Sequence, residues 1–129
     1  MNIFGIGSDI VKIDRIKKTM ISNSTFKKRI FTKKEISYCS KKRDKYSSFA
    51  KRFAAKEAFS KALGTGIAKG LKFNEIGIEN NNLGKPELKV VGNSLKIVKS
   101  IIKKKKFNVF LTLSDDKPFA IATLIIIVK

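Results

Sequence analysis

Two acidic residues and one lysine are the side chains of this sequence best suited to chemistry. In the segment RFAAKEAFSKALGTG (52–66), Glu57 and Lys61 are four residues apart, so a helix would place them one turn apart. Asp9 is embedded in the apolar run GIGSDIV, where an acidic residue is unusual and indicates a structural or functional role. The sequence contains no histidine, which excludes Ser-His-Asp triads and imidazole zinc sites. Any metal would therefore be held by carboxylates, which favours a hard cation such as Mg²⁺.

Glu57 also has a purely structural explanation. It precedes Lys61 in the order that favours a surface ion pair along a helix, worth about 0.2–0.5 kcal/mol. The neighbours of Glu57 weaken this explanation, because a helix also turns Phe53 and Ala54 toward its side. We therefore expect another chain segment, a subunit or a ligand to cover this face. A carboxylate under such a cover needs a cation.

The segment 52–66 has the pattern of a helix with one core-facing stripe. The residues at spacings of three and four, which we expect to face the core, are Ala55, Ala58, Phe59, Ala62 and Leu63. Gly64 is expected to end the helix. A P-loop precedes its helix, so the glycines after this one do not form a Walker site, although free amides beside Lys61 could hold a phosphate.

Asp9 is expected at the end of the first strand. Gly5 and Gly7 precede it and would let the backbone come close to another element. These glycines lack the third glycine of a dinucleotide-binding fingerprint. The alternative interpretation is that Asp9 caps a helix that starts near Lys12.

The remaining segments mix strands and helices without the regular alternation of a doubly wound sheet, which predicts an α+β fold. Strands are expected over residues 2–11, over 73–79 and 87–91 around the turn NNNLGKP, and over 107–113 and 119–128 as a hairpin that turns at SDDKP. Helices are expected around Ile13, Ile16 and Met20, from the capping box Thr32–Glu35 through Cys39, after an N-cap at Ser47 or Ser48, and over 95–102. The result is an antiparallel sheet packed against helices.

The chain is strongly basic. Its 129 residues are the size of one domain, 1–129, and 29 Lys and Arg against 10 Asp and Glu give a formal net charge of +19. Such a surface attracts polyanions, whether nucleic acids, nucleotides or acidic proteins. Aromatic residues interleaved with lysines in 26–46 make a non-enzymatic nucleic-acid-binding domain the competing hypothesis. Codon bias in an AT-rich genome would also produce the lysine excess.

The sequence predicts neither a membrane nor a secreted protein. The longest apolar run, 119–128, is about half of the roughly 20 residues that a membrane helix needs. The N-terminal MNIFGIGSDI lacks the basic region and cleavage site of a secretory signal. The single Cys39 can form neither an internal disulfide nor a metal site. These features favour the cytoplasm.

Two separated segments carry a resemblance to a known family. GIGSDIVKIDRI and RFAAKEAFSKALGTGI resemble the two signature motifs of the holo-acyl-carrier-protein synthases, the small-type 4'-phosphopantetheinyl transferases, and the similarity extends through FTKKE, GKP and FAIAT. The resemblance implies the α+β phosphopantetheinyl transferase fold, assembled as a homotrimer with active sites at subunit interfaces. It also implies transfer of 4'-phosphopantetheine from coenzyme A to a serine of an acidic acyl-carrier protein, with release of adenosine 3',5'-bisphosphate, in support of fatty acid biosynthesis.

The resemblance also implies roles for individual residues. Asp9 and Glu57 match the family's Mg²⁺ ligands, and Lys61, catalytic together with Glu57, matches the lysine that holds the pyrophosphate of coenzyme A. Arg15 matches the arginine that meets the acidic recognition helix of the carrier. The positions that match the lining of the coenzyme A site are Arg52, Ser60, Lys61, Gly64, Thr65 and Gly66.

Two points stay open within this resemblance. Some family members carry a histidine just before the last strand, where this chain has Asp115 and Asp116, so the contact of this region with the nucleotide is not predicted. The base that accepts the serine proton could be Glu57, a metal-bound water or a group of the carrier. A metal held by two carboxylates, with one lysine, is a sufficient set for phosphoryl chemistry, which consists mainly of positioning and charge neutralisation.

Overall fold

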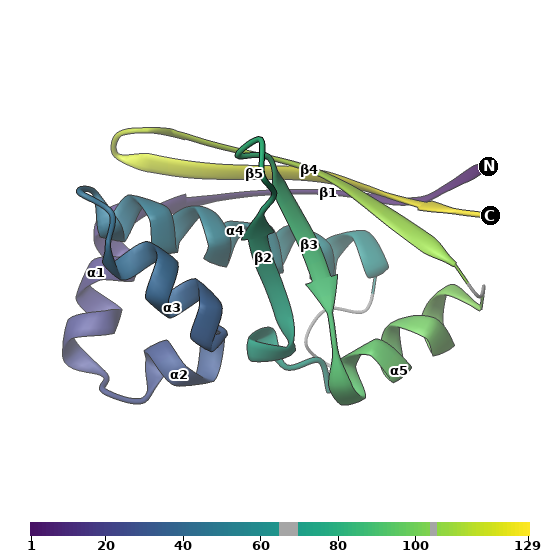
Figure 1. The fold of residues 1–129 in the computed structure, drawn as a ribbon, viewed down its shortest axis with the longest axis horizontal. Helices are drawn as coiled ribbons and strands as arrows, with labels where there is room; N and C mark the ends of the chain where they lie inside the picture. The colour runs from purple at the N-terminus through teal and green to yellow at the C-terminus, as the bar shows by residue number, and fades with distance from the viewer. Residues whose placement is uncertain (65–69, 104–105) are drawn as a thin grey trace.

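A computed structural model of the chain describes residues 1–64, 70–103 and 106–129 (Figure 1). Its elements in chain order are β1 (Asn2–Lys12), α1 (Ile13–Ser22), α2 (Phe26–Ile30), α3 (Lys33–Ser40), α4 (Lys45–Leu63), a 3₁₀ turn (Phe73–Glu75), β2 (Ile76–Asn80), β3 (Pro86–Val90), α5 (Gly92–Ile102), β4 (Phe107–Asp116) and β5 (Phe119–Val128). The predicted α+β class is confirmed. Residues 73–75, expected to begin a strand, form the 3₁₀ turn instead.

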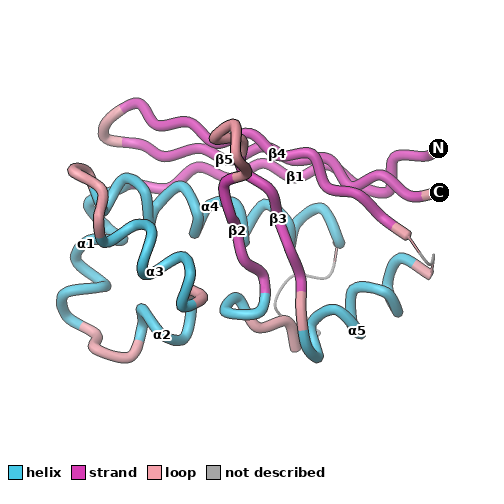
Figure 2. Tube along the Cα trace, viewed as in Figure 1, coloured by secondary structure: helices cyan, strands magenta, loops and turns pink. Residues whose placement is uncertain are grey.

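The strands form two separate antiparallel sheets, which Figure 2 shows in magenta. The larger sheet has the order β1-β5-β4, and the expected hairpin of its last two strands is confirmed. The smaller sheet is the hairpin of β2 and β3. Helix α4 runs along one face of the larger sheet, and α1 and α3 contact α4 on its other side (Figure 1). Helix α4 is therefore enclosed between two layers.

Two glycines allow α4 to lie directly on β1. A Cβ atom added at Gly7 would overlap the carbonyl oxygen of Ala58, and one added at Gly5 would overlap that of Ala62. Only glycine avoids these clashes, so the expected close backbone approach is confirmed. This contact sets the distance between the side chains of β1 and α4.

The environment of α4 shows which of the expected covers lies over Phe53 and Ala54. The predicted core stripe is buried, but Ala54 is also fully buried, and the ring of Phe53 packs against Phe26 and Phe73 with centroids 6.1 Å away in each case. Segments of the same chain therefore cover this face. Of the three covers expected for Phe53 and Ala54, the structure shows another segment of the same chain, because α4 has packing partners on opposite sides.

The start of α4 also differs from the expectation. Asp44 is its N-cap and accepts a hydrogen bond from the Ser47 amide at 3.4 Å, so neither Ser47 nor Ser48 caps the helix. Both serines are buried within the first turns, where the Ser48 hydroxyl donates to the sulfur of Cys39. The capping box that opens α3 is confirmed, with Thr32 and Glu35 bonded reciprocally. Of the described helices, none combines the length and the apolar content that a membrane crossing requires.

The face of the larger sheet opposite α4 is open and carries exposed apolar residues among polar ones. Ile6, Ile125 and Phe110 form a cross-strand row over β1, β5 and β4, and Ile6 and Phe110 are more than half exposed. Ile10 lies four pairs further along β1, beyond Ser8, and is also more than half exposed. No helix lies above this face in Figure 1. This exposed apolar row is a candidate interaction surface.

Candidate active site

The contact between β1 and α4 brings the three candidate catalytic residues together. Asp9 lies within β1, opposite Ala122, and not at the strand end. Its carboxylate accepts a hydrogen bond from the Lys61 ammonium at 2.8 Å, while Lys61 also donates to the Ser8 carbonyl at 3.3 Å. Helix α1 begins after Lys12 without a side-chain cap, so the interpretation of Asp9 as a helix cap is wrong.

Glu57 is the unpaired carboxylate of this cluster. Burial raises its pKa, and the nearby Asp9 carboxylate raises it further, while the positive charges of Lys61 and Arg15 act in the opposite direction without cancelling the effect. No ion pair joins Glu57 to Lys61 in the described part of the chain, because Lys61 pairs with Asp9. The expected surface ion pair along the helix is therefore not formed.

The charge distribution suits a cation with few protein ligands. Two carboxylates lie close enough to repel each other, and one of them is half-buried. Residues 1–64, 70–103 and 106–129 contain no group of three or more His, Cys, Asp or Glu side chains that could hold a metal. Asp9 and Glu57 would leave most coordination positions to water and phosphate oxygens, which is how proteins usually bind Mg²⁺. The donor set thus fits magnesium.

The other predicted residues near this cluster differ in accessibility. Arg15 is exposed on α1, and its positive charge is close enough to Glu57 to act on the pKa of that carboxyl, in the lowering direction. Ser60 is buried in α4, with 2% of its surface exposed. Gly64 ends α4 in the left-handed conformation, with φ at 83°, as expected of a helix stop. Thr65 and Gly66 lie outside the described residues.

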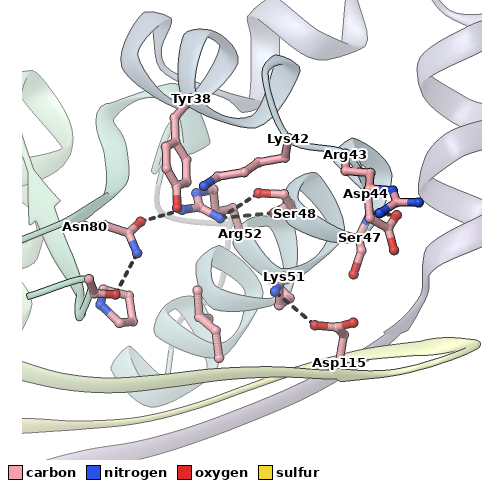
Figure 3. Close-up of a pocket in the computed structure, with 13 residues that line it drawn as sticks. Tyr38, Lys42, Arg43, Asp44, Ser47, Ser48, Lys51, Arg52, Asn80 and Asp115 are labelled. Atoms are coloured by element: carbon pink, nitrogen blue, oxygen red, sulfur yellow. Dashed lines mark hydrogen bonds and ion pairs between the residues drawn. The ribbon is translucent and has the colours of Figure 1, made fainter.

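Arg52 lies in a second site, a polar pocket of about 490 Å³ on another side of α4. Its guanidinium is buried and donates to the Ser48 carbonyl and hydroxyl, at 3.3 and 3.0 Å, and to the side-chain oxygen of Asn80 at 2.6 Å (Figure 3). Its Nε has no hydrogen-bond partner among the described residues. The guanidinium therefore carries a positive charge at the wall of the pocket, with its hydrogen bonds going to neutral groups of the chain.

Asp115 lines the same pocket and pairs with Lys51 at 2.9 Å. The hydrogen bond from Lys51 holds the pKa of Asp115 below its usual value. Asp116 is exposed, lies opposite Phe119 at the end of β4, and does not line the pocket. The two aspartates therefore have different surroundings, and only Asp115 belongs to the pocket.

Comparison with known proteins identifies the family. A family profile described as the 4'-phosphopantetheinyl transferase superfamily matches residues 5–123. This chain belongs to that superfamily. A curated relative from Pelagibacter ubique, named holo-[acyl-carrier-protein] synthase, is 47% identical over 126 residues and covers 98% of each chain. A relative of the same name from Clostridium tetani is 44% identical, covering 96% of this chain and 95% of its own.

Solved structures agree with the sequence comparison. The crystal structure of holo-[acyl-carrier-protein] synthase from Neisseria meningitidis superposes on this transferase with a TM-score of 0.83 and 36% identity, covering 98% of this chain and 99% of that one. The Helicobacter pylori synthase in complex with coenzyme A gives a TM-score of 0.78 and 34% identity, covering 95% and 99%. The resemblance of the two motifs to this family is thus confirmed over nearly the whole chain.

One ion pair of the transferase was missed by sequence reasoning. Lys56, fully buried in α4, donates to the carboxylate of Glu35 at 2.7 Å, to the Phe73 carbonyl at 2.8 Å and to the Ile76 carbonyl. The other Glu35 oxygen accepts the Ile78 amide at 3.0 Å. The capping box pointed to Glu35, but no local pattern pointed to its partner on a helix 21 residues away.

Proposed function

We propose that this transferase moves the 4'-phosphopantetheine group of coenzyme A to a serine of an acyl-carrier protein and releases adenosine 3',5'-bisphosphate, in support of fatty acid biosynthesis. The observation that carries the proposal is the cluster of Asp9, Glu57 and Lys61, two carboxylates and a lysine at one contact between β1 and α4. The relatives named above are holo-acyl-carrier-protein synthases, and one was solved with coenzyme A. Family membership leaves the nucleic-acid-binding alternative without support.

Magnesium is the proposed cofactor. Asp9 and Glu57 would hold the ion, which when bound neutralises pyrophosphate charge and makes the phosphorus more electrophilic. Lys61 supplies a second positive charge, and the hydrogen bond to Asp9 raises its pKa, so it stays protonated at neutral pH. The lysine therefore suits a role in holding the pyrophosphate, as the resemblance implies. The base for the carrier serine stays open among Glu57, a bound water and the carrier.

A homotrimer with active sites between subunits is the proposed assembly. Coenzyme A carries a pyrophosphate and a separate ribose 3'-phosphate, and this chain has two cationic centres, at Lys61 and at Arg52. These centres lie on different sides of α4, since Lys61 contacts β1 while Arg52 contacts Asn80 of β2. In an assembly with active sites between subunits, one substrate would meet cationic centres from two chains, and the exposed apolar row of the larger sheet is the proposed contact between them. Light scattering tests this assembly, and we expect Phe110→Lys to shift the protein toward the monomer.

The proposed carrier surface includes Arg15. This residue is exposed on α1, and its positive charge acts on the pKa of Glu57. A partner bound to Arg15 would therefore lie beside the proposed reaction centre. The net charge of +19 favours fast encounter with an acidic carrier and with coenzyme A. A cytoplasmic location stays a prediction.

One experiment tests the proposed function. The protein is incubated with coenzyme A, Mg²⁺ and an apo acyl-carrier protein, and the intact mass of the carrier is measured. We expect the carrier to gain the mass of one phosphopantetheine group and adenosine 3',5'-bisphosphate to accumulate. An unchanged carrier mass, with a characterised synthase modifying the same carrier in parallel, would refute the proposal.

A further inference from the structure

The ring of Tyr38 gathers two cations inside the polar pocket. The Lys42 ammonium lies 4.4 Å from the ring centroid, and the central carbon of the Arg52 guanidinium lies 4.6 Å from it. Tyr38 is on α3, Lys42 follows the end of that helix, and Arg52 comes from α4. Figure 3 shows these three side chains converging on the Asn80 side of the pocket. The negative face of an aromatic ring attracts cations at such distances.

The carboxylates of the pocket are occupied by other lysines. Asp115 pairs with Lys51 at 2.9 Å, and Asp44 pairs with Lys117 at 3.0 Å. Within the described part of the chain, Lys42 and Arg52 have no carboxylate partner. The two cations on Tyr38 therefore carry positive charge that the pocket does not neutralise.

The two cations held on the Tyr38 ring repel each other. A doubly charged anion that binds beside them offsets this repulsion and forms charge-assisted hydrogen bonds with both cations. The charge and the volume of the pocket fit a phosphate monoester on a nucleoside. Coenzyme A carries one such group, the ribose 3'-phosphate, which is not part of the pyrophosphate that reacts.

We propose that Tyr38 is a positioning residue that holds Lys42 and Arg52 ready for the ribose 3'-phosphate, and so sets the selectivity of this protein for coenzyme A over 3'-dephospho-coenzyme A. This inference rests on the proposed function, since it takes coenzyme A as the substrate. The ring lowers the entropy that the two cations lose when the phosphate binds. Because the 3'-phosphate is remote from the reacting bond, Tyr38 acts on KM and not on kcat.

The test is a comparison of Tyr38→Leu with the wild type, using coenzyme A and 3'-dephospho-coenzyme A as alternative substrates for carrier modification. We expect Tyr38→Leu to raise KM for coenzyme A about tenfold, with kcat at saturating coenzyme A and KM for 3'-dephospho-coenzyme A within about twofold of the wild type. An unchanged KM for coenzyme A, or an equal rise of KM for both substrates, would overturn the inference.

Two variants serve as matched controls. Tyr38→Phe keeps the ring without the hydroxyl, and we expect it to restore the wild-type KM for coenzyme A. The other tyrosine of the chain, Tyr46, also lies near two lysines, Lys17 at 5.4 Å and Lys45 at 5.3 Å, but does not line this pocket. Tyr46→Leu should leave the coenzyme A selectivity unchanged. If Tyr38→Phe loses affinity as Tyr38→Leu does, the hydroxyl and not the ring is responsible, and the inference fails.

A binding measurement separates this inference from the proposed function. Titration calorimetry with adenosine 3',5'-bisphosphate needs no transfer reaction, and Lys42→Met changes an exposed side chain without touching the core. We expect Lys42→Met and Tyr38→Leu each to weaken binding about tenfold relative to the wild type. Weaker binding in a protein that modifies no carrier would refute the transferase proposal alone. Wild-type binding by both variants in a protein that does modify the carrier would refute the role of Tyr38 alone.

Discussion

Two lysine–carboxylate pairs on helix α4 have nearly equal contact distances and opposite surroundings. Lys56 and Glu35 are 2.7 Å apart and both fully buried, whereas Lys61 and Asp9 are 2.8 Å apart, with 57% and 13% of their side-chain surfaces exposed. The first pair is bonded to four backbone groups, those of Thr32, Phe73, Ile76 and Ile78. The second lies beside a further carboxylate, Glu57, for which the described residues supply no paired cation. Distance alone therefore does not separate a structural pair from a reactive one.

What separates the pairs is whether their charges are balanced. Each donor of Lys56 has an acceptor, although burial lowers the pKa of its ammonium. In the other cluster, Lys61 pairs with Asp9, no described cation pairs with Glu57, and the pKa of Glu57 is raised. A balanced network holds a fold in place, while an unbalanced one can accept a ligand.

The largest expected effect is on folding. Lys56→Met should lower the free energy of unfolding by about 3–5 kcal/mol, because it leaves the Glu35 carboxylate buried without its cation. Lys61→Met should lower it by less than about 1 kcal/mol, because the Lys61 side chain is largely in water. Urea denaturation of both variants measures the difference. Equal losses would show that burial does not separate the two pairs.

The second effect is on catalysis, where we expect the exposed lysine, Lys61, to matter more than the buried Lys56. Lys61→Met should lower kcat/KM for carrier modification about 100-fold, equal to about 2.7 kcal/mol, because the variant loses a cation expected at the pyrophosphate. The matched control is Lys18→Met on α1, which removes another exposed ion pair, to Asp14 at 3.3 Å. Steady-state kinetics should show the control near the wild-type rate. If both variants lose the same activity, the effect belongs to net charge and not to the position of Lys61.

The smallest effect is a change in the pH dependence of stability without metal. A raised native pKa means that the native state holds the Glu57 proton longer than the unfolded state, so stability falls as the pH rises from the ordinary value of 4.5 through the raised one. Glu57→Gln should remove this fall and raise the melting temperature at pH 7 in EDTA. Glu75→Gln is the control of opposite sign, because the pKa of Glu75 is lowered by its hydrogen bond from Ser94. A lower melting temperature for Glu57→Gln at pH 7 would contradict the charge imbalance.

Magnesium should also change the melting temperature. Binding to Asp9 and Glu57 stabilises the native state by mass action, so thermal denaturation should shift upward with Mg²⁺ in the wild type. The shift should shrink as the pH approaches the raised pKa of Glu57 from above, because the proton competes with the metal. An equal shift in Glu57→Gln would show that magnesium binds elsewhere.

The sequence predicted what depends on local pattern. Gly5 and Gly7 indicated a close backbone approach, the Thr32–Glu35 box indicated a helix start, and both are present. The spacing of apolar residues in α4 correctly predicted which face of this helix packs in the core. Asp9 and Glu57 were recognisable because acidic residues in apolar surroundings are uncommon. These features are set by residues a few positions apart in the chain.

What depends on contacts between distant segments was not predictable. Phe53 is covered by Phe26 and Phe73, which come from two other elements. The pocket around Arg52 takes side chains from α3, α4, β2 and β4, so no window of sequence contained it. The N-cap of α4 was misplaced because Ser47, Ser48 and Asp44 are all good caps, and tertiary packing selected Asp44.

The central claim is that Asp9 and Glu57 together support magnesium-dependent transfer to a carrier serine. The most direct measurement is the intact mass of an apo acyl-carrier protein after incubation with coenzyme A and the wild type, Asp9→Asn or Glu57→Gln, each with Mg²⁺ or with EDTA. We predict a phosphopantetheine mass gain only for the wild type with Mg²⁺, while both variants stay folded by circular dichroism. Carrier modification by either variant at the wild-type rate, or by the wild type in EDTA, would contradict the account.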